Sequence, residues 1–418
     1  MEKLIIQGGN RLEGRVRVSS AKNAVLPIIA GTLLASTPSK LLEIPNLEDV
    51  GTICQVIESL GVKIARNNAD GEIVFDASTL TATEAPYELV RKMRASFLVM
   101  GPLLARKGEA KISMPGGCAI GARPIDLHLK AFEALGAKIE ITEDYVYAHA
   151  PEGLKGTQIY LDFPSVGATE NVIMAASMAE GKTVIENAAE EPEIWDLAEF
   201  LNSMGANIVG AGTGKITIEG VDHLGGIKYK PIYDRIEAGT FMISAAITNS
   251  RIKINGINGE HLRPLIEKLK ECGINFEELG ESVIVDGTGP KKPVDIKTLP
   301  YPGFPTDMQP QMMSLLCLIE GSSIVTETIF ENRFMHVAEL TRMGAKIKID
   351  GRTAFIEGVN KLTGCEVKAT DLRAGAAMIL VGLVAEGTTE IGDIYHIDRG
   401  YQDIEKKFRG LGADIERI

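Results

Sequence analysis

The chain has 418 residues, a formal net charge of −12, 45% hydrophobic residues and 24% charged residues. That length allows two or three domains, each with a buried core of its own. The acidic balance argues against nonspecific binding to nucleic acid, which needs concentrated Lys and Arg. The longest uncharged stretch, Ala24 to Ser39, contains two prolines and is shorter than the roughly 18 residues of a membrane span. We therefore expect neither nucleic acid nor a membrane as a partner.

The cysteines and histidines indicate the redox compartment of the protein and which cofactors to expect. Five cysteines without a C-x-x-C pair are typical of free thiols in a reducing compartment. The first ten residues, MEKLIIQGGN, lack the basic and apolar regions of a signal peptide, so we expect a cytoplasmic protein. Six scattered histidines show no metal-ligand spacing, so neither a metal site nor an organic cofactor is expected.

One phrase recurs along the whole chain: an amphipathic helix, a hydrophobic–Gly–small turn, and then a strand. Its copies read ESLGVKI, EALGAKI, NSMGANI, KECGINF, TRMGAKI and RGLGADI, spaced by 68 to 75 residues. Such regular self-similarity predicts six structural units. The glycine suits the turn because it adopts the left-handed conformation that closes a helix.

Each unit also contains a helix that is apolar on every side. The six read AVLPIIAGTLLA, SFLVMGPLLA, NVIMAASMA, TFMISAAIT, PQMMSLLCLI and AGAAMILVGLVA. Helices of this kind must be buried inside a domain, and short runs such as RIKING and SIVTETIF indicate strands between them. The sequence therefore predicts an α/β fold: an inside-out barrel of six repeats of about 70 residues, with helices inside and sheets outside.

The two ends of the chain predict how the units close. The sixth unit stops at GADIERI without its final strands, whereas the N-terminus, IQGGNRLEGRVRVSSAKNA, matches the tail of other units. We infer that residues before about Lys22 supply strands to the last unit. The domains would be 22–229 and 1–21 plus 230–418, with a hinge at 19–23 and 228–235. A simple repeat array would not explain the missing strands.

Cations gather where the apolar helices begin. Lys22, Arg235 and Arg373 fall at equivalent positions, and Arg94 stands at the same kind of boundary. A helix N-terminus offers free N–H groups and a positive dipole end, so a cation there favours an anion site. An acidic protein with this pattern is predicted to bind an anionic substrate in a cleft between its domains. The alternative is that each cation only pairs with neighbouring acids.

The segment SMPGGCAIGARPIDLHL, residues 113–129, is the strongest candidate for chemistry. Three glycines surround Cys118, and Arg123 follows. Such a loop can close over a ligand, and a thiol beside a cation can act as nucleophile or proton donor. Cys54, Cys272 and Cys317 lie in helical patterns and are interpreted as small buried hydrophobes, as is Cys365 with less support.

Several motifs resemble those of the enolpyruvyl transferases along the whole chain. They are SSAKNA, MRAS, PGGCAIGARPIDLHL, SVGATEN, NAAEEPEI, FPTDMQPQ, ENRFMHVAEL, DLRAG and DRGY. The resemblance is closest to members that act on UDP-N-acetylglucosamine, because those that act on shikimate 3-phosphate lack the Cys118 loop. It implies transfer of the enolpyruvyl group of phosphoenolpyruvate to the 3'-hydroxyl of UDP-N-acetylglucosamine, with loss of phosphate, as the first committed step of peptidoglycan synthesis.

The resemblance also assigns residues. Cys118 would donate a proton to the methylene carbon, could carry a covalent thioketal of phosphoenolpyruvate, and would be alkylated by the inhibitor fosfomycin. Asp307 would be the base beside the sugar hydroxyl. The remaining residues would bind the two substrates. Phosphoenolpyruvate would contact Lys22, Asn23, Arg123, Arg333, Arg373 and Arg399; UDP-N-acetylglucosamine would contact Arg94, Arg123, Pro124, Ile125, Asp126, Leu127, Ser165, Val166, Gly167, Asp307 and Ile329.

One departure and three alternatives accompany this interpretation. Phe163 stands where some family members carry Lys, which puts one contact to the nucleotide in doubt. The alternatives are an enzyme that acts on shikimate 3-phosphate, a catalytically silent paralogue, and a purely structural scaffold. The Cys118 loop argues against the first, and the retained Cys118, Asp307 and cations argue against the second. Cations at helix starts argue against the third.

Overall fold

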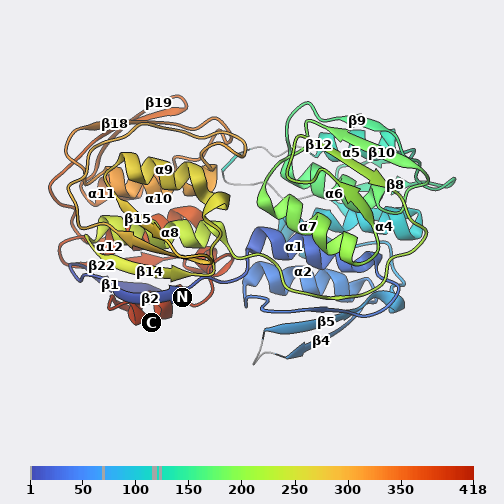
Figure 1. Ribbon diagram of the computed structural model, residues 1–418, viewed down its shortest axis with the longest axis horizontal. Helices are drawn as coiled ribbons and strands as arrows, with labels where there is room; N and C mark the ends of the chain where they lie inside the picture. The colour runs from blue at the N-terminus through green and yellow to red at the C-terminus, as the bar shows by residue number, and fades with distance from the viewer. Residues whose placement is uncertain (1, 68–70, 115–119, 122–124) are drawn as a thin grey trace. The chain divides into compact units, whose positions relative to one another are not determined.

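The computed structural model describes the chain except for residues 1, 68–70, 115–119 and 122–124. It has mixed α/β content and divides into two compact units. Unit 1 comprises Met1–Ser19, Cys118–Ala122 and Tyr233–Ile418; unit 2 comprises Ser20–Gly117 and Arg123–Ile232. Each unit has its own cluster of buried apolar side chains. Figure 1 shows the course of the chain through both.

Unit 2 contains three sheets among its described residues. The strand orders are β13–β3–β5–β4, β6–β8–β7 and β11–β12–β10–β9. The strands are β3 (Ser39–Leu41), β4 (Lys63–Asn67), β5 (Glu72–Asp76), β6 (Glu109–Ser113), β7 (Lys138–Ile141), β8 (Tyr145–His149), β9 (Gln158–Tyr160), β10 (Lys182–Glu186), β11 (Asn207–Val209), β12 (Lys215–Glu219) and β13 (Lys228–Tyr229). The helices are α1 (Lys22–Gly31), η1 (Thr32–Leu34), α2 (Glu48–Ser59), η2 (Ala77–Thr79), α3 (Tyr87–Lys92), η3 (Arg94–Val99), α4 (Met100–Lys107), α5 (Asp126–Ala134), α6 (Val166–Ala176) and α7 (Pro192–Ser203).

Unit 1 also contains three sheets among its described residues. Their orders are β21–β22–β1–β23, β15–β16–β14–β2 and β17–β18–β20–β19. The strands are β1 (Leu4–Gln7), β2 (Glu13–Arg17), β14 (Arg251–Asn255), β15 (Asn275–Glu278), β16 (Ser282–Asp286), β17 (Ile296–Lys297), β18 (Ser322–Thr326), β19 (Lys346–Asp350), β20 (Thr353–Glu357), β21 (Glu366–Lys368), β22 (Thr388–Gly392) and β23 (Asp414–Arg417). The helices are α8 (Arg235–Ile247), η4 (Gly259–Leu262), α9 (Arg263–Glu271), η5 (Thr306–Met308), α10 (Gln309–Leu316), α11 (His336–Arg342), α12 (Leu372–Gly382), α13 (Tyr395–Asp398) and α14 (Ile404–Gly410).

The apolar helices are buried, as the sequence predicts. Every residue of α8 and of α10 is buried, and so is every residue of α12 after Leu372. The three helices pack on one another inside unit 1 (Figure 1). The strands alternate instead: in β14, Ile252 and Ile254 are buried and Arg251 is exposed. A sheet with one solvated face produces this period of two.

The six repeated glycines all end helices in the left-handed conformation. Their φ angles lie between 95° and 111°; they are Gly61, Gly136, Gly205, Gly273, Gly344 and Gly412. Side chains with a Cβ avoid this region, so the recurring glycine of the sequence phrase has a local backbone reason.

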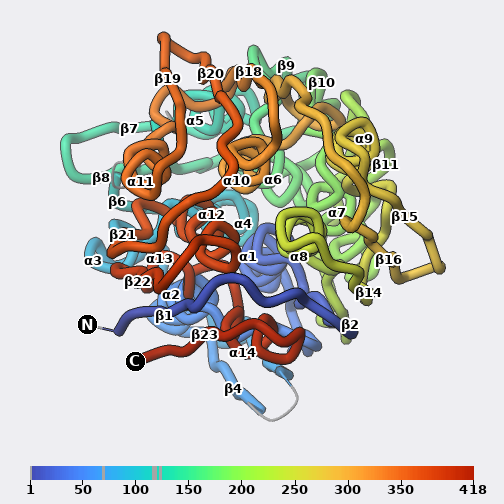
Figure 2. Tube along the Cα trace, turned by 90° about the vertical axis from the view of Figure 1, so that its left-hand side faces the viewer, coloured from blue at the N-terminus to red at the C-terminus, as the bar shows by residue number. Residues whose placement is uncertain are grey.

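The N-terminal segment completes two sheets rather than one. Strand β1 lies between β22 and β23 in the last sheet, as Figure 2 shows for the two ends of the chain. Strand β2, however, runs parallel to β14 in the sheet of the fourth unit. The prediction that the N-terminus supplies strands to the last unit holds for β1 and is wrong for β2, because β2 hydrogen-bonds to β14 in a different sheet.

Hydrogen bonds fix the chain at two of its passages between units, on the unit 1 side at Ser19 and on the unit 2 side at Ile232. In unit 1, the Ser19 N–H donates to the buried Glu237 carboxylate (2.7 Å) and Lys407 Nζ donates to Ser19 Oγ (2.7 Å). In unit 2, the Asp196 carboxylate accepts from the Tyr229 hydroxyl (2.7 Å) and from the Ile232 N–H (3.1 Å).

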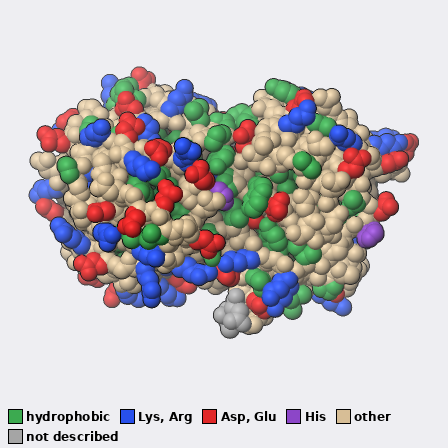
Figure 3. All heavy atoms as spheres, viewed as in Figure 1, with side chains coloured by type: hydrophobic (Ala, Val, Ile, Leu, Met, Phe, Trp, Pro, Cys, Tyr) green, Lys and Arg blue, Asp and Glu red, His purple; other side chains and the backbone are tan. Residues whose placement is uncertain are grey.

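The surface and the helices also concern the two partner classes that the sequence excludes, nucleic acid and membranes. On the face drawn in Figure 3, basic side chains are interleaved with acidic ones. Within the described ranges, no helix combines the length and apolarity that crossing a bilayer requires.

Burial of Asp196 predicts a pH-dependent stability. Burial raises the pKa of Asp196 from 3.8 to about 6, although the bonds from Tyr229 and Ile232 oppose the rise. The folded chain therefore holds this proton more tightly than the unfolded chain. That stabilisation is complete below about pH 4 and is lost as the pH rises through 6, which amounts to about 3 kcal/mol.

Asp196→Asn removes the titration. We expect the wild-type protein to lose about 3 kcal/mol of unfolding free energy relative to this variant between pH 4 and pH 7, measured by urea denaturation. Asp222→Asn, at an exposed position of the same unit, is the matched control and should follow the wild type. Parallel curves of unfolding free energy against pH for the wild type and Asp196→Asn would contradict the raised pKa of Asp196.

Candidate active site

A carboxylate held between two guanidiniums is the strongest charge cluster near the predicted site residues. Asp307 lies in η5, directly before α10, and its two oxygens accept from Arg333 Nη2 (3.0 Å) and Arg373 Nη2 (2.9 Å). The arginine side chains are only 2% and 4% exposed, whereas that of Asp307 is 26% exposed. Thus Asp307 is the member of the triad that reaches solvent.

Local structure holds both arginines in place. Arg373 is the second residue of α12, and its N–H donates to the helix-capping carboxylate of Asp371 (2.8 Å). The Arg333 guanidinium lies 5.4 Å from the centre of the Phe330 ring. Burial alone would lower the pKa of Arg373, but the Asp307 carboxylate outweighs it and the pKa is raised. The Arg373 guanidinium therefore stays charged.

Several nitrogens of these guanidiniums lack a hydrogen-bond acceptor among the described residues. Arg333 Nε and Nη1 and Arg373 Nη1 are buried and donate to none of the described groups. Buried donors are rarely left unpaired. An anion or ordered water at the triad would satisfy them, and a carboxylate or phosphate fits the fork of a guanidinium well.

The geometry also bears on Asp307 as a base. A carboxylate whose two oxygens face cations favours its ionised form. Such a group is well suited to orient a hydroxyl, and a proton taken from that hydroxyl would weaken both ion pairs. The predicted role of Asp307 as the base stays a prediction.

The Cys118 loop is described only in part. Cys118, Arg123 and Pro124 lie outside the described residues. Of the segment grouped with unit 1, Ile120 accepts a hydrogen bond from the Asn332 N–H (3.0 Å), and a Cβ on Gly121 would lie 2.0 Å from the Glu331 carboxylate. The described part of the loop thus contacts the two residues that precede Arg333.

The predicted cations of unit 2 stand at helix starts. Lys22 is the first residue of α1 and pairs with Asp49 (2.8 Å), a buried acid in the first turn of α2. Arg94 is the first residue of η3. The alternative interpretation, that each cation pairs with a neighbouring acid, therefore describes Lys22 correctly, but a paired lysine can still contact a ligand.

A polar cluster at the start of α6 includes a residue that the sequence did not single out, His128. Ser165 caps α6 by accepting from the Ala168 N–H (3.4 Å). A Cβ on the neighbouring Gly167 would lie 3.3 Å from His128 Cε1, so the imidazole packs directly against the helix start.

The tautomer of His128 follows from its partner. Asn171 Oδ1 accepts from the Gly101 N–H (2.9 Å), so its Nδ2 is the group that faces Phe97 O (3.2 Å) and His128 Nδ1 (3.0 Å). Nδ1 is then an acceptor, and the proton is on Nε2. Burial and the charge of Arg94 lower the pKa of His128 to about 4. The result is a neutral N–H donor, and its place within the segment 113–129 is a sequence signal that could have pointed to it.

The other predicted residues occupy defined places. Asn23 is half-buried in α1, and Ile125 precedes α5, which starts with Asp126 and Leu127. Val166 begins α6, and Arg399 follows α13. The N–H of Ile329 already donates to Glu327 Oε1 (2.8 Å), so only its carbonyl and side chain remain for a ligand. Phe163 is exposed after β9.

Three of the remaining thiols behave as the sequence predicts. Cys54, Cys272 and Cys317 are fully buried, and burial raises their pKa to about 11, 11 and 12. A thiol with so high a pKa is a poor nucleophile at neutral pH. Cys365 is half-buried. In the described part of the chain, no group of three or more His, Cys, Asp or Glu side chains is placed to hold a metal ion.

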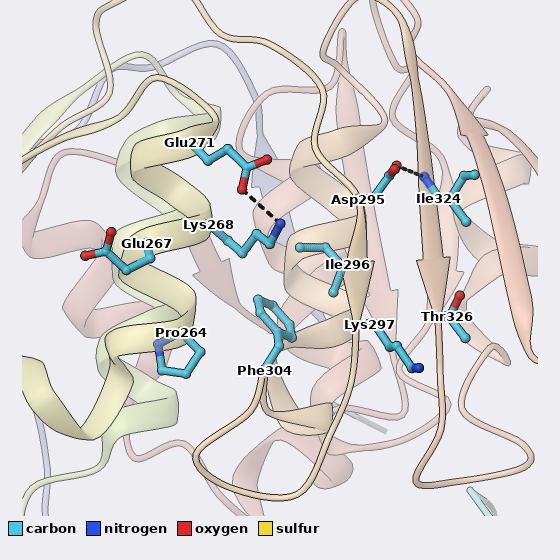
Figure 4. Close-up of a pocket in the computed structure, with 10 residues that line it drawn as sticks. All are labelled: Pro264, Glu267, Lys268, Glu271, Asp295, Ile296, Lys297, Phe304, Ile324 and Thr326. Atoms are coloured by element: carbon cyan, nitrogen blue, oxygen red, sulfur yellow. Dashed lines mark hydrogen bonds and ion pairs between the residues drawn. The ribbon is translucent and has the colours of Figure 1, made fainter.

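A cavity of about 530 Å³ lies elsewhere in unit 1, between α9 and the strands β17 and β18 (Figure 4). Three of its charged residues already have partners: Lys268 pairs with Glu271 (2.9 Å), and Asp295 accepts from the Ile324 N–H (2.8 Å). None of the predicted site residues lines it. The predicted site therefore lies outside this cavity.

Comparison with known proteins identifies the family. The family model described as "EPSP synthase (3-phosphoshikimate 1-carboxyvinyltransferase)" matches residues 6–408. The chain belongs to this family of enolpyruvyl transferases. It is similar to UDP-N-acetylglucosamine 1-carboxyvinyltransferase 2 of Clostridium tetani and of Carboxydothermus hydrogenoformans, each 62% identical over all of both chains. It is 57% identical to UDP-N-acetylglucosamine 1-carboxyvinyltransferase 1 of Staphylococcus aureus, again over all of both chains.

Solved enolpyruvyl transferase structures share the fold. The enolpyruvyl transferase NikO from Streptomyces tendae superimposes with a TM-score of 0.90 at 25% identity, over 100% of this chain and 98% of that one. EPSP synthase from Acinetobacter baumannii gives a TM-score of 0.77 at 20% identity over all of both chains, which shows likeness of fold alone.

The buried triad predicts a large cost for removing its carboxylate. Asp307→Asn removes the carboxylate that the two buried guanidiniums share, so we expect the unfolding free energy to fall by about 3–5 kcal/mol in chemical denaturation. The matched control is Asp398→Asn. Its partner Arg417 is 24% exposed and also pairs with Glu405, so the loss should be about 1 kcal/mol or less. Equal losses in the two variants would contradict the importance of burial.

Proposed function

We propose that this protein transfers the enolpyruvyl group of phosphoenolpyruvate to the 3'-hydroxyl of UDP-N-acetylglucosamine, releasing phosphate. This is the first committed step of peptidoglycan synthesis. The observation that carries the proposal is 56–62% identity, over at least 99% of this chain, to relatives named for this carboxyvinyl transfer. Such identity leaves little room for a different acceptor.

The reaction is an addition followed by an elimination. The sugar oxygen bonds to C2 of phosphoenolpyruvate while a proton adds to its methylene carbon, which gives a tetrahedral ketal. Loss of a proton from the new methyl group and departure of phosphate then restore the double bond. No net oxidation occurs, so acids, bases and cations of the chain suffice for every step.

Phosphoenolpyruvate carries several negative charges, and the proposed binding residues supply cations. They are Lys22, Arg123, Arg333, Arg373 and Arg399, with Asn23 beside Lys22. The spare donors of the Arg333 and Arg373 guanidiniums support this assignment in particular. Because the charges of the substrate persist through the transition state, these cations both bind the substrate and stabilise the departing phosphate.

The nucleotide-sugar is assigned to the helix starts of unit 2 and to two residues of unit 1. The proposed contacts are Arg94, Arg123, Pro124, Ile125, Asp126, Leu127, Ser165, Val166 and Gly167, with Asp307 and Ile329. A helix N-terminus with free N–H groups suits a diphosphate. The neutral His128 N–H beside Gly167 is a further donor at that helix start.

The finer architecture belongs to the same proposal. Each unit is an inside-out barrel of three repeats, with the inner helices surrounded by sheets. The predicted placement of the site in a cleft between the domains stays a prediction, as does the cytoplasmic location. No cofactor enters any step described above.

A second candidate function differs from the proposed one in its acceptor, which would be shikimate 3-phosphate. The matching family model is described by 3-phosphoshikimate, whereas the relatives at 62% identity are named for UDP-N-acetylglucosamine. We expect phosphate release from phosphoenolpyruvate with UDP-N-acetylglucosamine and none above background with shikimate 3-phosphate, measured with purified protein and each acceptor in turn. Release with shikimate 3-phosphate alone would overturn the proposed function.

The proposed proton donor gives a separate prediction. Cys118→Ala should lower the rate of phosphate release by about 10²–10⁴-fold, because a positioned general acid contributes that much, while UDP-N-acetylglucosamine binding measured by calorimetry is retained. Fosfomycin with UDP-N-acetylglucosamine should add one inhibitor mass to the wild type and none to Cys118→Ala. Cys365→Ala, at a half-buried thiol, is the control and should still be modified. Wild-type turnover in Cys118→Ala would refute the role.

A further inference from the structure

Tyr401 is the largest fully buried side chain of unit 1, and the reaction scheme above gives it no role. Its side chain is 1% exposed, although it follows Arg399 of the proposed binding set by only two residues. A phenol hydroxyl in such a place is costly unless it is hydrogen-bonded. Its partners therefore indicate what it holds together.

The hydroxyl of Tyr401 joins two of the inner helices. It lies 2.9 Å from Thr240 Oγ1 of α8 and 3.3 Å from Gln311 Nε2 of α10. Thr240 Oγ1 also donates to the Ile236 carbonyl (2.9 Å), which uses its only hydrogen. Tyr401 must then donate to Thr240 and accept from Gln311. The hydroxyl protons of Thr240 and Tyr401 are thereby assigned.

The ring of Tyr401 faces the third inner helix. The Arg373 guanidinium of α12 lies 5.5 Å from the ring centre, within the range of a cation–π interaction. Burial raises the pKa of Tyr401, and the charge of Arg373 opposes only part of that rise. The phenol therefore keeps its proton, and the ring carries no charge that would compete with Asp307 for Arg373.

Tyr401 is also tied to the backbone that carries Arg399. The N–H groups of Gly400 and Tyr401 both donate to the Ile397 carbonyl (3.0 Å each). At Gly400 the chain passes so close to α12 that a Cβ would lie 2.6 Å from Leu372 Cδ2. A fixed Tyr401 thus limits where the backbone of Arg399 can lie.

We propose that Tyr401 is a positioning residue: hydrogen-bonded to α8 and α10, it holds Arg373 and Arg399 where phosphoenolpyruvate binds. The assignment rests on the proposed function, because it needs phosphoenolpyruvate to be the ligand of these guanidiniums. Tyr401 itself does not touch the substrate. It acts through the two arginines, and its loss weakens the ground state and the transition state alike.

The test is Tyr401→Phe, which keeps the ring and removes the hydroxyl. We expect the KM for phosphoenolpyruvate to rise roughly fivefold, the cost of one hydrogen bond, while kcat changes less than twofold. Thr240→Val removes one of the two partners of that hydroxyl and should give a smaller rise in the same KM. The double variant should be no worse than Tyr401→Phe, because Tyr401→Phe already breaks the bond to Thr240.

A control variant distinguishes the positioning role of Tyr401 from a purely structural one. Phe408→Leu creates a cavity beside Phe241 in the same core and should lower the Tm without a change in the KM for phosphoenolpyruvate. A substrate-free readout accompanies the kinetics: the side-chain Nε–Hε resonance of Arg373 should shift in Tyr401→Phe and stay in place in Phe408→Leu.

The outcomes distinguish failure of the proposed function from failure of the proposed role of Tyr401. No phosphate release by the wild type with either acceptor would end the proposed function, and the Arg373 resonance would still decide whether Tyr401 positions that side chain. An active Tyr401→Phe enzyme with an unchanged KM for phosphoenolpyruvate overturns the role of Tyr401 alone. A fivefold rise in the KM for phosphoenolpyruvate that also occurs in Phe408→Leu would likewise overturn the role of Tyr401.

Discussion

Six helices that are apolar on every side can be stable only if protein surrounds them. In unit 1 this condition is met by α8, α10 and α12, which pack on one another while strands cover them. A helix buried along its length can present polar groups to a ligand only at its ends. The polar groups that these helices can offer to a ligand are therefore at their ends, and the positions of Lys22, Arg235 and Arg373 at helix starts agree with that constraint.

Charges at buried helix ends need partners, and the two units provide them differently. Arg333 and Arg373 share Asp307, which leaves several guanidinium nitrogens for a ligand. Lys22 instead has an acid of its own, Asp49. Sharing one carboxylate between two guanidiniums leaves charged donors in a poorly solvated place. Donors of this kind attract an anion more strongly than an exposed cation does.

Polar groups away from the site fulfil a second task, which is to hold the irregular segments. Asp196 fixes Tyr229 and Ile232, and Glu237 fixes Ser19. Each of these carboxylates is buried, and each accepts backbone N–H groups that would otherwise lack partners. Tyr401 extends the same device to the segment that carries Arg399. The repeats supply the framework, and single buried polar side chains determine where the chain between them runs.

The sequence by itself determined the repeat, the buried helices, the cations at their starts and the family. These features are local: the glycine at Gly61 or Gly344 closes its own helix, and an all-apolar stretch must be buried in any fold. Only the tertiary structure decided that β2 joins β14, that Arg333 and Arg373 share Asp307, and that Asn171 sets the tautomer of His128. Each of these joins residues far apart in the chain, and spacing alone carries no record of which distant groups meet. The physical reason is that strand pairing and long-range hydrogen bonds depend on how the side chains pack. That packing depends on the sequence of the whole chain.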